Sequence, residues 1–427
     1  MKTEETTLIW FRNDLRILDN ESLYKASEFN ECIAIYVFNE NDFEENKDGF
    51  RKLGRYRYHF ILETLKDLKN NLAKFNIPLL IFKGNQKNIL EQKIIQLNVS
   101  KVFMHTIPGI EEFGIENSIT EFCKIKNVSI NKYSSNTLIH ISDLKFTQVN
   151  FPKIFTQFRK NVESELTIRK EFPDPKKTNS TEFFDFFNSK NYLKEQSIQK
   201  YHHDLNFEGG ETIGLKRLDY YLWQSNKIEV YKETRNGLIG MDYSTKFSAW
   251  LAVGAISPRR IYWEIKKYES QILKNESTYW VIFELLWRDY FNFYMHFFPL
   301  AYFRFKQNAV NFYNENQKII FNNWKIGNTG IPFVDANMKE LLTTGFMSNR
   351  GRQNVASYLI NDLKINWFAG AKYFQEYLID FDVASNYGNW SYLAGKGNDP
   401  RTNRYFNIEK QRQTYDPKNE YINLWNN

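Results

Sequence analysis

Short runs of apolar and β-branched residues alternate with amphipathic segments along the first 131 residues. Helical periodicity between the runs predicts helices over 52–75, 86–97 and 110–126. Continuous apolar strands that alternate with helices are typical of a parallel, doubly wound sheet with helices on both faces. We therefore expect an α/β domain over residues 1–131, with strands at TTLIWF (6–11), CIAIYVF (32–38), PLLIF (78–82) and KVFMH (101–105).

The pattern changes after residue 131. Residues 132–200 are irregular and include EFPDPKKTNSTEFF (171–184), which predicts a long interdomain connector. Beyond residue 201 the strand pattern disappears, so residues 201–427 predict an all-α domain. Its clearest predicted helices are 211–225, 257–270, 277–297, 334–344, 350–362 and 368–379.

Composition narrows the class of protein only slightly. The 57 Lys and Arg against 50 Asp and Glu give a net charge of +7, which suits a polyanionic partner or mere solubility. Cys32 and Cys123 are too few for a disulfide framework, which favours a reducing compartment, and we expect a cytoplasmic protein. The chain has no apolar run of about 18 residues, so we expect no membrane partner.

The sequence motifs of several enzyme classes are absent. The chain contains no GxSxG, Walker-A, HExxH or CxxC motif. Residues 380–390 resemble a calcium loop but lack its Gly and its final Glu, and the chain has only 6 His. We therefore expect no metal site.

Two kinds of segment place polar groups among apolar ones. The apolar helix STYWVIFELLWRDYFNFYMHFF (277–298) carries Glu284 and Arg288 on one face, which indicates either a buried ion pair or a site. Residues 347–354 and 378–390 offer hydrogen-bonding groups suited to a large polar cofactor. These groups are Asn349, Arg352, Asp380, Asp382 and Asn386; helix capping or turn formation is the alternative for the two asparagines.

Six segments, in order, resemble the photolyase/cryptochrome family. They are WFRNDLR (10–16), FTQFRKNVE (155–163), YKETRNGLIGMDYSTKFSAWLAVGAISPR (231–259), STYWVIFELLWRDYF (277–291), TGFMSNRGRQNVASYL (344–359) and IDFDVASNYGNWSYLAGKGNDPR (379–401). The segments GGETIGLKRLDYYLW (209–223) and SNRGRQN (348–354) are similar to those of the DASH cryptochromes. The resemblance covers almost the whole chain and implies an N-terminal α/β domain followed by a helical domain that holds FAD.

The resemblance also implies which residues hold the FAD. Hydroxyl and backbone N–H donors suit the diphosphate. Asn386 stands where the family places a residue beside the flavin N5, and an amide there is the repair-type choice. The diphosphate positions are Tyr231, Ser244, Thr245, Lys246, Phe247 and Ser248, and the further contacts are Arg288, Asn349, Arg352, Asp380 and Asp382.

A lesion site is implied beside the flavin. Glu284 matches the glutamate that contacts the paired pyrimidines, and Trp287 matches the aromatic wall on which a flipped lesion rests. Gln353 and Tyr392 stand where duplex-repairing photolyases carry Met and Trp. A more polar pocket gains less from accepting an extruded dimer, so we expect single-stranded DNA to be favoured.

DNA contacts and a second chromophore are further implications. Arg235 and Arg350 match rim positions that contact DNA, with Arg401 and Arg404 as additions in a segment of different length; a solvated basic face is the alternative. Many members hold a folate antenna, methenyltetrahydrofolate in DASH proteins. The expected Glu-Val pair is Ile107 and Pro108 here, so Glu111 or Glu112 would have to supply the acidic contact.

A tryptophan chain that reduces the flavin is implied only in part. Trp390 and Trp367 match its first two members, although ordinary core packing would also account for both. The third position holds Asn314, with Tyr313 beside it. Either Tyr313 is the terminal donor or electrons follow another route.

Light-driven repair of cyclobutane pyrimidine dimers by a monomeric enzyme is the function that these residues favour. Glu284 and Asn386 favour it over the two alternatives. These are a blue-light receptor with a regulatory role, and a nucleic-acid-binding flavoprotein without catalysis. Fold and cofactor alone do not separate the three.

Overall fold

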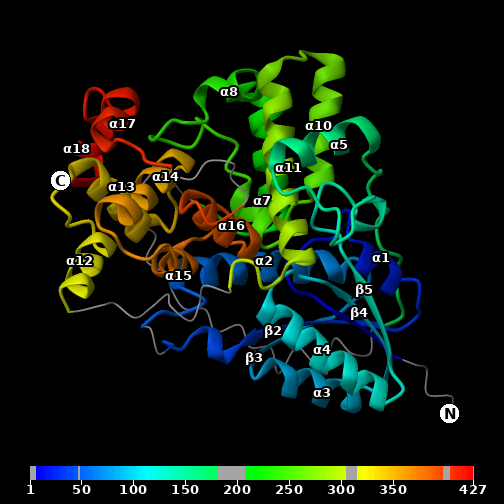
Figure 1. Ribbon diagram of the computed structural model, residues 1–427. Helices are drawn as coiled ribbons and strands as arrows, with labels where there is room; N and C mark the ends of the chain where they lie inside the picture. Colours follow the sequence, from blue (N-terminus) through cyan, green and yellow to red (C-terminus); the bar gives the residue numbers. More distant parts are fainter. Residues whose placement is uncertain (1–5, 47–48, 181–206, 304–314, 398–403, 427) are drawn as a thin grey trace, which may run out of the picture.

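One parallel sheet organises the N-terminal part of the chain. The computed structural model describes residues 6–46, 49–180, 207–303, 315–397 and 404–426 (Figure 1). The sheet has five parallel strands in the order β3-β2-β1-β4-β5. They are β1 (Thr6–Trp10), β2 (Cys32–Asn39), β3 (Leu79–Gly84), β4 (Val99–His105) and β5 (Ser129–Tyr133).

Helices cover both faces of this sheet. Successive strand residues enter different cores: Ile9 and Ala34 join the core on the side of α1 and α2, whereas Leu8 and Ile33 join the core formed with α3 and α4. The expectation of a doubly wound sheet is confirmed. The four helices are α1 (Glu21–Ala26), α2 (Arg55–Ala73), α3 (Gln86–Gln96) and α4 (Ile110–Ile125).

The segment predicted as an irregular connector contains regular secondary structure at its start and farther along. Strand β5 crosses residue 131, where the first domain was expected to end, and α5 (Phe155–Glu165) lies inside the predicted connector. The strand was missed because SINKY carries no apolar run; it pairs only with β4 at the edge of the sheet. Residues 181–200 of the predicted connector lie outside the described residues.

The described part beyond residue 207 is helical, as predicted. Two predicted helices, 211–225 and 350–362, end in a π-helical turn, at Tyr220–Gln224 and Tyr358–Asp362. No helix among the described residues is both long and apolar enough to cross a membrane. The α-helices are α7 (Glu211–Asp219), α8 (Tyr231–Thr234), α9 (Ser248–Ala252), α10 (Pro258–Gln271), α11 (Glu276–Phe297), α12 (Glu315–Lys325), α13 (Pro332–Thr344), α14 (Asn349–Ser357), α15 (Trp367–Tyr377), α16 (Val383–Leu393), α17 (Ile408–Tyr415) and α18 (Glu420–Asn426).

The two parts share a buried junction. Arg259 of α10 forms an ion pair of 2.8 Å with Asp19, and both side chains are fully buried. Gly254, in the left-handed region at φ 69°, lies so close to Asn13 that an added Cβ would meet its carbonyl oxygen at 1.9 Å. The carboxylate of Glu211 accepts hydrogen bonds from the backbone N–H groups of Ile17 and Leu18, both at 2.8 Å. The junction therefore holds the sheet against the helices that form the site.

Candidate functional site

A cavity of about 460 Å³ opens among α8, α9, α11, α14 and α16. Of the predicted site residues, Arg350 and Trp367 are not in its wall, and Tyr313 lies outside the described residues. The lining residues come from positions more than 150 residues apart in the chain. The predicted site residues that line it are Tyr231, Arg235, Ser244, Thr245, Lys246, Phe247, Ser248, Glu284, Trp287, Arg288, Asn349, Arg352, Gln353, Asp380, Asp382, Asn386, Trp390 and Tyr392.

A lysine is buried in the segment before α9. Lys246 has a left-handed backbone at φ 61° and its side chain is buried. Its Nζ atom has no hydrogen-bond partner and lies 3.4 Å from the ring centre of Tyr243. Burial lowers the pKa of Lys246 well below its usual value, and the charge of Glu340 opposes this only in part. A buried amine without a hydrogen-bond partner suits a bound anion at this wall of the cavity.

Glu284 and Arg288 of α11 do not pair with each other. Arg235 of the segment after α8 donates a hydrogen bond to the Glu284 carboxylate, and the Trp280 indole donates another at 3.2 Å. Arg288 instead donates to the backbone carbonyls of Asn136 and Leu251. The interpretation of Glu284 and Arg288 as a buried ion pair is therefore wrong.

The environment of Glu284 favours its neutral form. The surrounding protein desolvates the carboxyl group and raises its pKa; the positive charge of Arg235 and the hydrogen bond from Trp280 oppose this shift. The side chain still keeps 34% of its exposure because it faces the open cavity. The raised pKa makes protonation of this carboxyl group easier, and in its protonated form it can donate a hydrogen bond to a ligand carbonyl.

Acidic and amide groups also line the cavity. Asp380 is buried and binds Arg352 through both oxygens, at 2.8 and 3.0 Å. Asp382 caps α16 by accepting a hydrogen bond from the backbone of Ser385. Asn386, inside α16, donates to the Ala371 carbonyl at 3.0 Å, which fixes its amide on the cavity wall.

The capping alternative for the two asparagines is wrong. Ser348, and not Asn349, caps α14, because its hydroxyl accepts the backbone N–H of Gly351 at 2.9 Å. Asn349 is the first residue of that helix and its exposed side chain lines the cavity. Asn386 lies within α16, whose cap is Asp382.

An aromatic wall continues along α11. The Trp287 ring stacks on Phe155 with 3.7 Å between ring centres, and the Tyr392 ring meets it edge-on at 5.8 Å. Arg404, which also lines the cavity, donates to the Tyr392 hydroxyl and lies over its ring. Phe155 was not predicted as a site residue, although it begins the FTQFRKNVE segment that carried part of the resemblance.

The predicted DNA-binding arginines occupy different positions. Arg350 lies behind the cavity wall and donates to the Gln353 side chain at 2.9 Å and to that of Asn236 at 3.1 Å. It therefore orients Gln353, which lines the cavity. Arg235 is bound to Glu284, and Arg401 lies outside the described residues.

The indoles assigned to the electron chain are buried. Trp390 lines the cavity, with its ring centre 6.4 Å from that of Trp324. Trp367 begins α15 and packs edge-on against Phe368. Because Tyr313 is outside the described residues, the predicted route through Trp367 and Tyr313 stays a prediction.

Comparison with known proteins assigns the chain to a family. Residues 7–176 match the DNA photolyase model and residues 280–426 match the model of the FAD-binding domain of DNA photolyase. A Synechocystis sp. protein named Cryptochrome DASH is 42% identical over 435 residues, which cover 98% of this chain and 87% of that protein. The chain belongs to the photolyase/cryptochrome family. Within this family, the chain is also 43% identical to Cryptochrome DASH of Xenopus laevis, over 97% of this chain and 81% of that one.

Solved structures agree with this assignment. The crystal structure of a Synechocystis sp. cryptochrome superposes with a TM-score of 0.91 at 41% identity, covering 100% of this chain and 89% of that chain. A class III photolyase of Agrobacterium tumefaciens superposes with a TM-score of 0.81 at 24% identity, covering 100% and 87%, and this likeness shows the shared fold alone.

FAD is the cofactor of this chain, as the match to the FAD-binding domain of DNA photolyase shows, and the donors that line the cavity suit it. The buried Lys246 amine and the hydroxyls of Ser244, Thr245 and Ser248 are donors suited to a diphosphate. Asp380 and Asn386 add acidic and amide groups on the facing wall. Among the described residues no cluster of His, Cys, Asp or Glu could hold a metal ion.

The residues proposed for a folate antenna lie near the start of α4. Glu111 forms an ion pair with Lys52 at 2.6 Å. Burial raises the pKa of Glu112 to about 7. The Ile107 backbone N–H donates to Glu116, so the segment is held in place without either glutamate. Folate binding by this DASH cryptochrome stays a prediction.

Proposed function

We propose that this DASH-type cryptochrome repairs cyclobutane pyrimidine dimers in single-stranded DNA in a light-driven reaction. The observation that supports this most is the position of Glu284, which lines the same cavity as the residues that the family resemblance assigns to FAD. A glutamate held by an arginine and an indole, with a raised pKa, has a specific orientation that solubility alone does not require.

Each wall of the cavity has a role in this proposal. Reduced FAD supplies an electron when it absorbs light. Glu284 donates a hydrogen bond to a pyrimidine carbonyl and stabilises negative charge that develops there. Trp287, which lines the cavity and is backed by the buried Phe155, offers a flat apolar surface for the lesion. Asn386, whose amide is held by the Ala371 carbonyl on the cavity wall, would contact the flavin ring when FAD is bound.

The preference for single strands follows from the polarity of the lesion side. Gln353 and Tyr392 line the cavity, and each is bound by an arginine, Arg350 and Arg404. Flipping the dimer out of a duplex costs a few kcal/mol of unstacking and unpairing, and contacts with a polar wall recover less of that cost than contacts with an apolar wall. Single-stranded DNA avoids the cost. We propose further that the protein acts as a monomer in the cytoplasm.

A repair assay tests the proposal. Chemically reduced protein is illuminated with a dimer in a single-stranded and in a duplex oligonucleotide, and repaired thymines are quantified. We expect repair of the single-stranded substrate, a lower rate on the duplex, and loss of most activity in Glu284→Ala. Glu276→Ala is the matched control, because Glu276 lies on the same helix but its side chain is 80% exposed.

The assay also separates the rival functions. Absence of repair on either substrate by fully reduced protein would contradict the enzymatic proposal and favour a blue-light receptor. Equal repair of both substrates would contradict only the preference for single strands. Full activity of Glu284→Ala would exclude the assigned role of that residue.

A further inference from the structure

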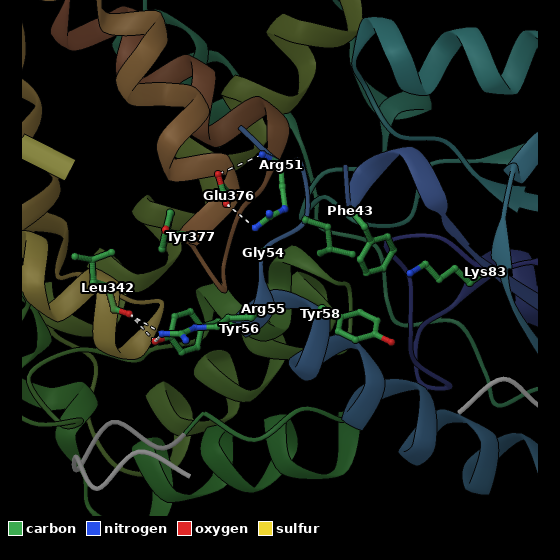
Figure 2. A pocket seen from close by; sticks show the side chains of 11 residues that line it. Phe43, Arg51, Gly54, Arg55, Tyr56, Tyr58, Lys83, Leu342, Glu376 and Tyr377 are labelled. Atoms are coloured by element: carbon green, nitrogen blue, oxygen red, sulfur yellow. Dashed lines mark hydrogen bonds and ion pairs between the residues drawn. The ribbon is translucent and has the colours of Figure 1, made fainter. Parts of the chain in front are cut away.

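A second cavity, of about 580 Å³, lies where the α/β part meets the helical part (Figure 2). Its walls come from the segment after β2, from the end of β3, from the start of α2, and from the C-terminal ends of α13 and α15. Its lining residues include the charged and aromatic side chains of Phe43, Arg51, Arg55, Lys83, Glu376 and Tyr377.

The charges around this cavity favour an anion. Arg51, Arg55 and Lys83 line it, against the single carboxylate of Glu376. Arg51 lies 3.9 Å from that carboxylate, and Lys83 lies over the Phe43 ring at 3.9 Å. Arg51 is also paired with Glu45 at 2.7 Å, and Arg55 and Lys83 add further positive charge to the walls, so a small anion would be attracted to this cavity.

A continuous line of aromatic rings joins the two cavities. Trp390, in the wall of the first cavity, has its ring centre 6.4 Å from that of Trp324. The Trp324 ring lies 5.6 Å from Tyr373, and Tyr373 lies 4.5 Å from Tyr377, which lines the second cavity. Trp390, Trp324 and Tyr373 are buried, whereas Tyr377 is half-buried.

Hydrogen bonds to backbone carbonyls fix two of these rings. The Trp324 indole donates to the Val355 carbonyl at 3.1 Å, and the Tyr373 hydroxyl donates to the Lys325 carbonyl at 2.8 Å. These bonds hold both rings in fixed orientations along the line. Tyr377 is the first member of the line that borders the second cavity, and its half-buried side chain is accessible to solvent.

We propose that the second cavity is an electron entry port, where a small anionic enediol such as ascorbate reduces Tyr377, and that electrons pass from there through Tyr373 and Trp324 to Trp390. When the Trp390 indole gives one electron to the light-excited, oxidised flavin, it becomes a radical cation. Trp324 and then Tyr373 each return one electron inward, and Tyr377 finally loses one electron to the relay and its phenolic proton to solvent. The enediol restores Tyr377 with one electron and one proton and is itself oxidised.

This route ends at the domain junction, and it differs from the predicted route through Trp367 and Tyr313. It depends on the FAD of the family and is independent of whether the lesion is repaired. Tyr377→Phe is the main variant, because it removes only the phenolic hydroxyl that the relay needs. Trp324→Phe tests the middle of the relay, and Trp367→Phe tests the other route.

The experiment uses oxidised holoprotein, illuminated and frozen, with electron paramagnetic resonance to identify the radical. Protein grown with ring-deuterated tyrosine assigns a tyrosyl signal. We expect wild type and Trp367→Phe to show that signal, and Tyr377→Phe and Trp324→Phe to lose it. A wild-type yield of tyrosyl radical in either of the last two variants would overturn the proposed relay. An unchanged flavin absorption spectrum and an unchanged thermal unfolding midpoint in Tyr377→Phe show that its fold and its FAD site are intact.

The port is tested by the concentration dependence of photoreduction. Lys83→Glu reverses one charge of the cavity, and we expect the ascorbate concentration for half-maximal rate to rise about fivefold. The rate with an uncharged thiol should stay the same, because it gains nothing from the positive charges. An unchanged ascorbate dependence in Lys83→Glu would overturn the port.

Discussion

Burial shifts the pKa values of two residues that line the first cavity. Burial raises the pKa of Glu284 and lowers the pKa of Lys246 well below its usual value, so desolvation moves both residues toward their neutral forms. The two neutral forms have different consequences. A neutral Glu284 gains a proton that it can donate to a ligand, whereas Lys246 regains its charge when an anion binds beside it.

The raised pKa of Glu284 predicts a pH dependence of repair. The protonated, donating form is present below the pKa and is lost as pH rises through it, so the repair rate of reduced protein should fall with rising pH. We expect a fall of about tenfold, the effect of one hydrogen bond to a charged group. Glu284→Gln, which donates at every pH, should flatten the profile. A profile with the same slope in this variant would contradict protonation of Glu284 as the cause.

At the scale of secondary structure, periodicity predicted the elements with strong patterns and missed those without them. The predicted helix 277–297 is α11 almost to the residue, because apolar residues run along its whole length. Strand β5 has no continuous run of apolar residues, and α5 lies in a segment of mixed composition. The π-helical turns at 220–224 and 358–362 depend on tertiary packing and have no local signature.

Helix packing around the cavity predicts the effect of a single methyl group. In α16, a Cβ at Gly388 would meet Phe291 of α11 at 2.3 Å. Helix propensity alone would make Gly388→Ala stabilising by about 1 kcal/mol, but overpacking costs about 1–3 kcal/mol, so the variant should be less stable. The measurement is the free energy of unfolding in urea.

Gly114 supplies the matched control. It lies inside α4, and a Cβ there would meet nothing within 4 Å. Gly114→Ala should therefore raise the free energy of unfolding by up to about 1 kcal/mol. If both variants were stabilised, the contact between α11 and α16 would be looser than the structure shows.

At the scale of the whole molecule, the sequence indicated the residues of the site but not their partners. The ordered motifs placed Glu284, Asp380 and Asn386 in one site, and the structure does bring them together around one cavity. Local patterns do not show that Arg235 binds Glu284. Such contacts depend on how whole helices are oriented, and the hydrophobic periodicity of a single segment does not specify that orientation. The line of rings from Trp390 to Tyr377 was missed for the same reason.

The buried pair Asp19 and Arg259 gives the strongest prediction about the junction. Both side chains are fully buried, and Asp19 also accepts hydrogen bonds from the Ser257 hydroxyl and the Phe172 backbone. Asp19→Asn keeps a residue that tolerates the left-handed backbone at φ 55° but leaves Arg259 as an unpaired buried charge. We expect the free energy of unfolding to fall by about 3–5 kcal/mol.

A second variant shows whether the unpaired charge is the cause of that loss. Adding Arg259→Met to Asp19→Asn removes the buried charge, so the double variant should recover part of the stability. Glu165→Gln breaks an exposed pair with Lys145, whose side chains keep 48% and 69% of their exposure, and should leave the unfolding midpoint unchanged. If the double variant were less stable than Asp19→Asn alone, Arg259 would stabilise the junction by its other contacts, and the charge pair would not be what holds the sheet to the helical part.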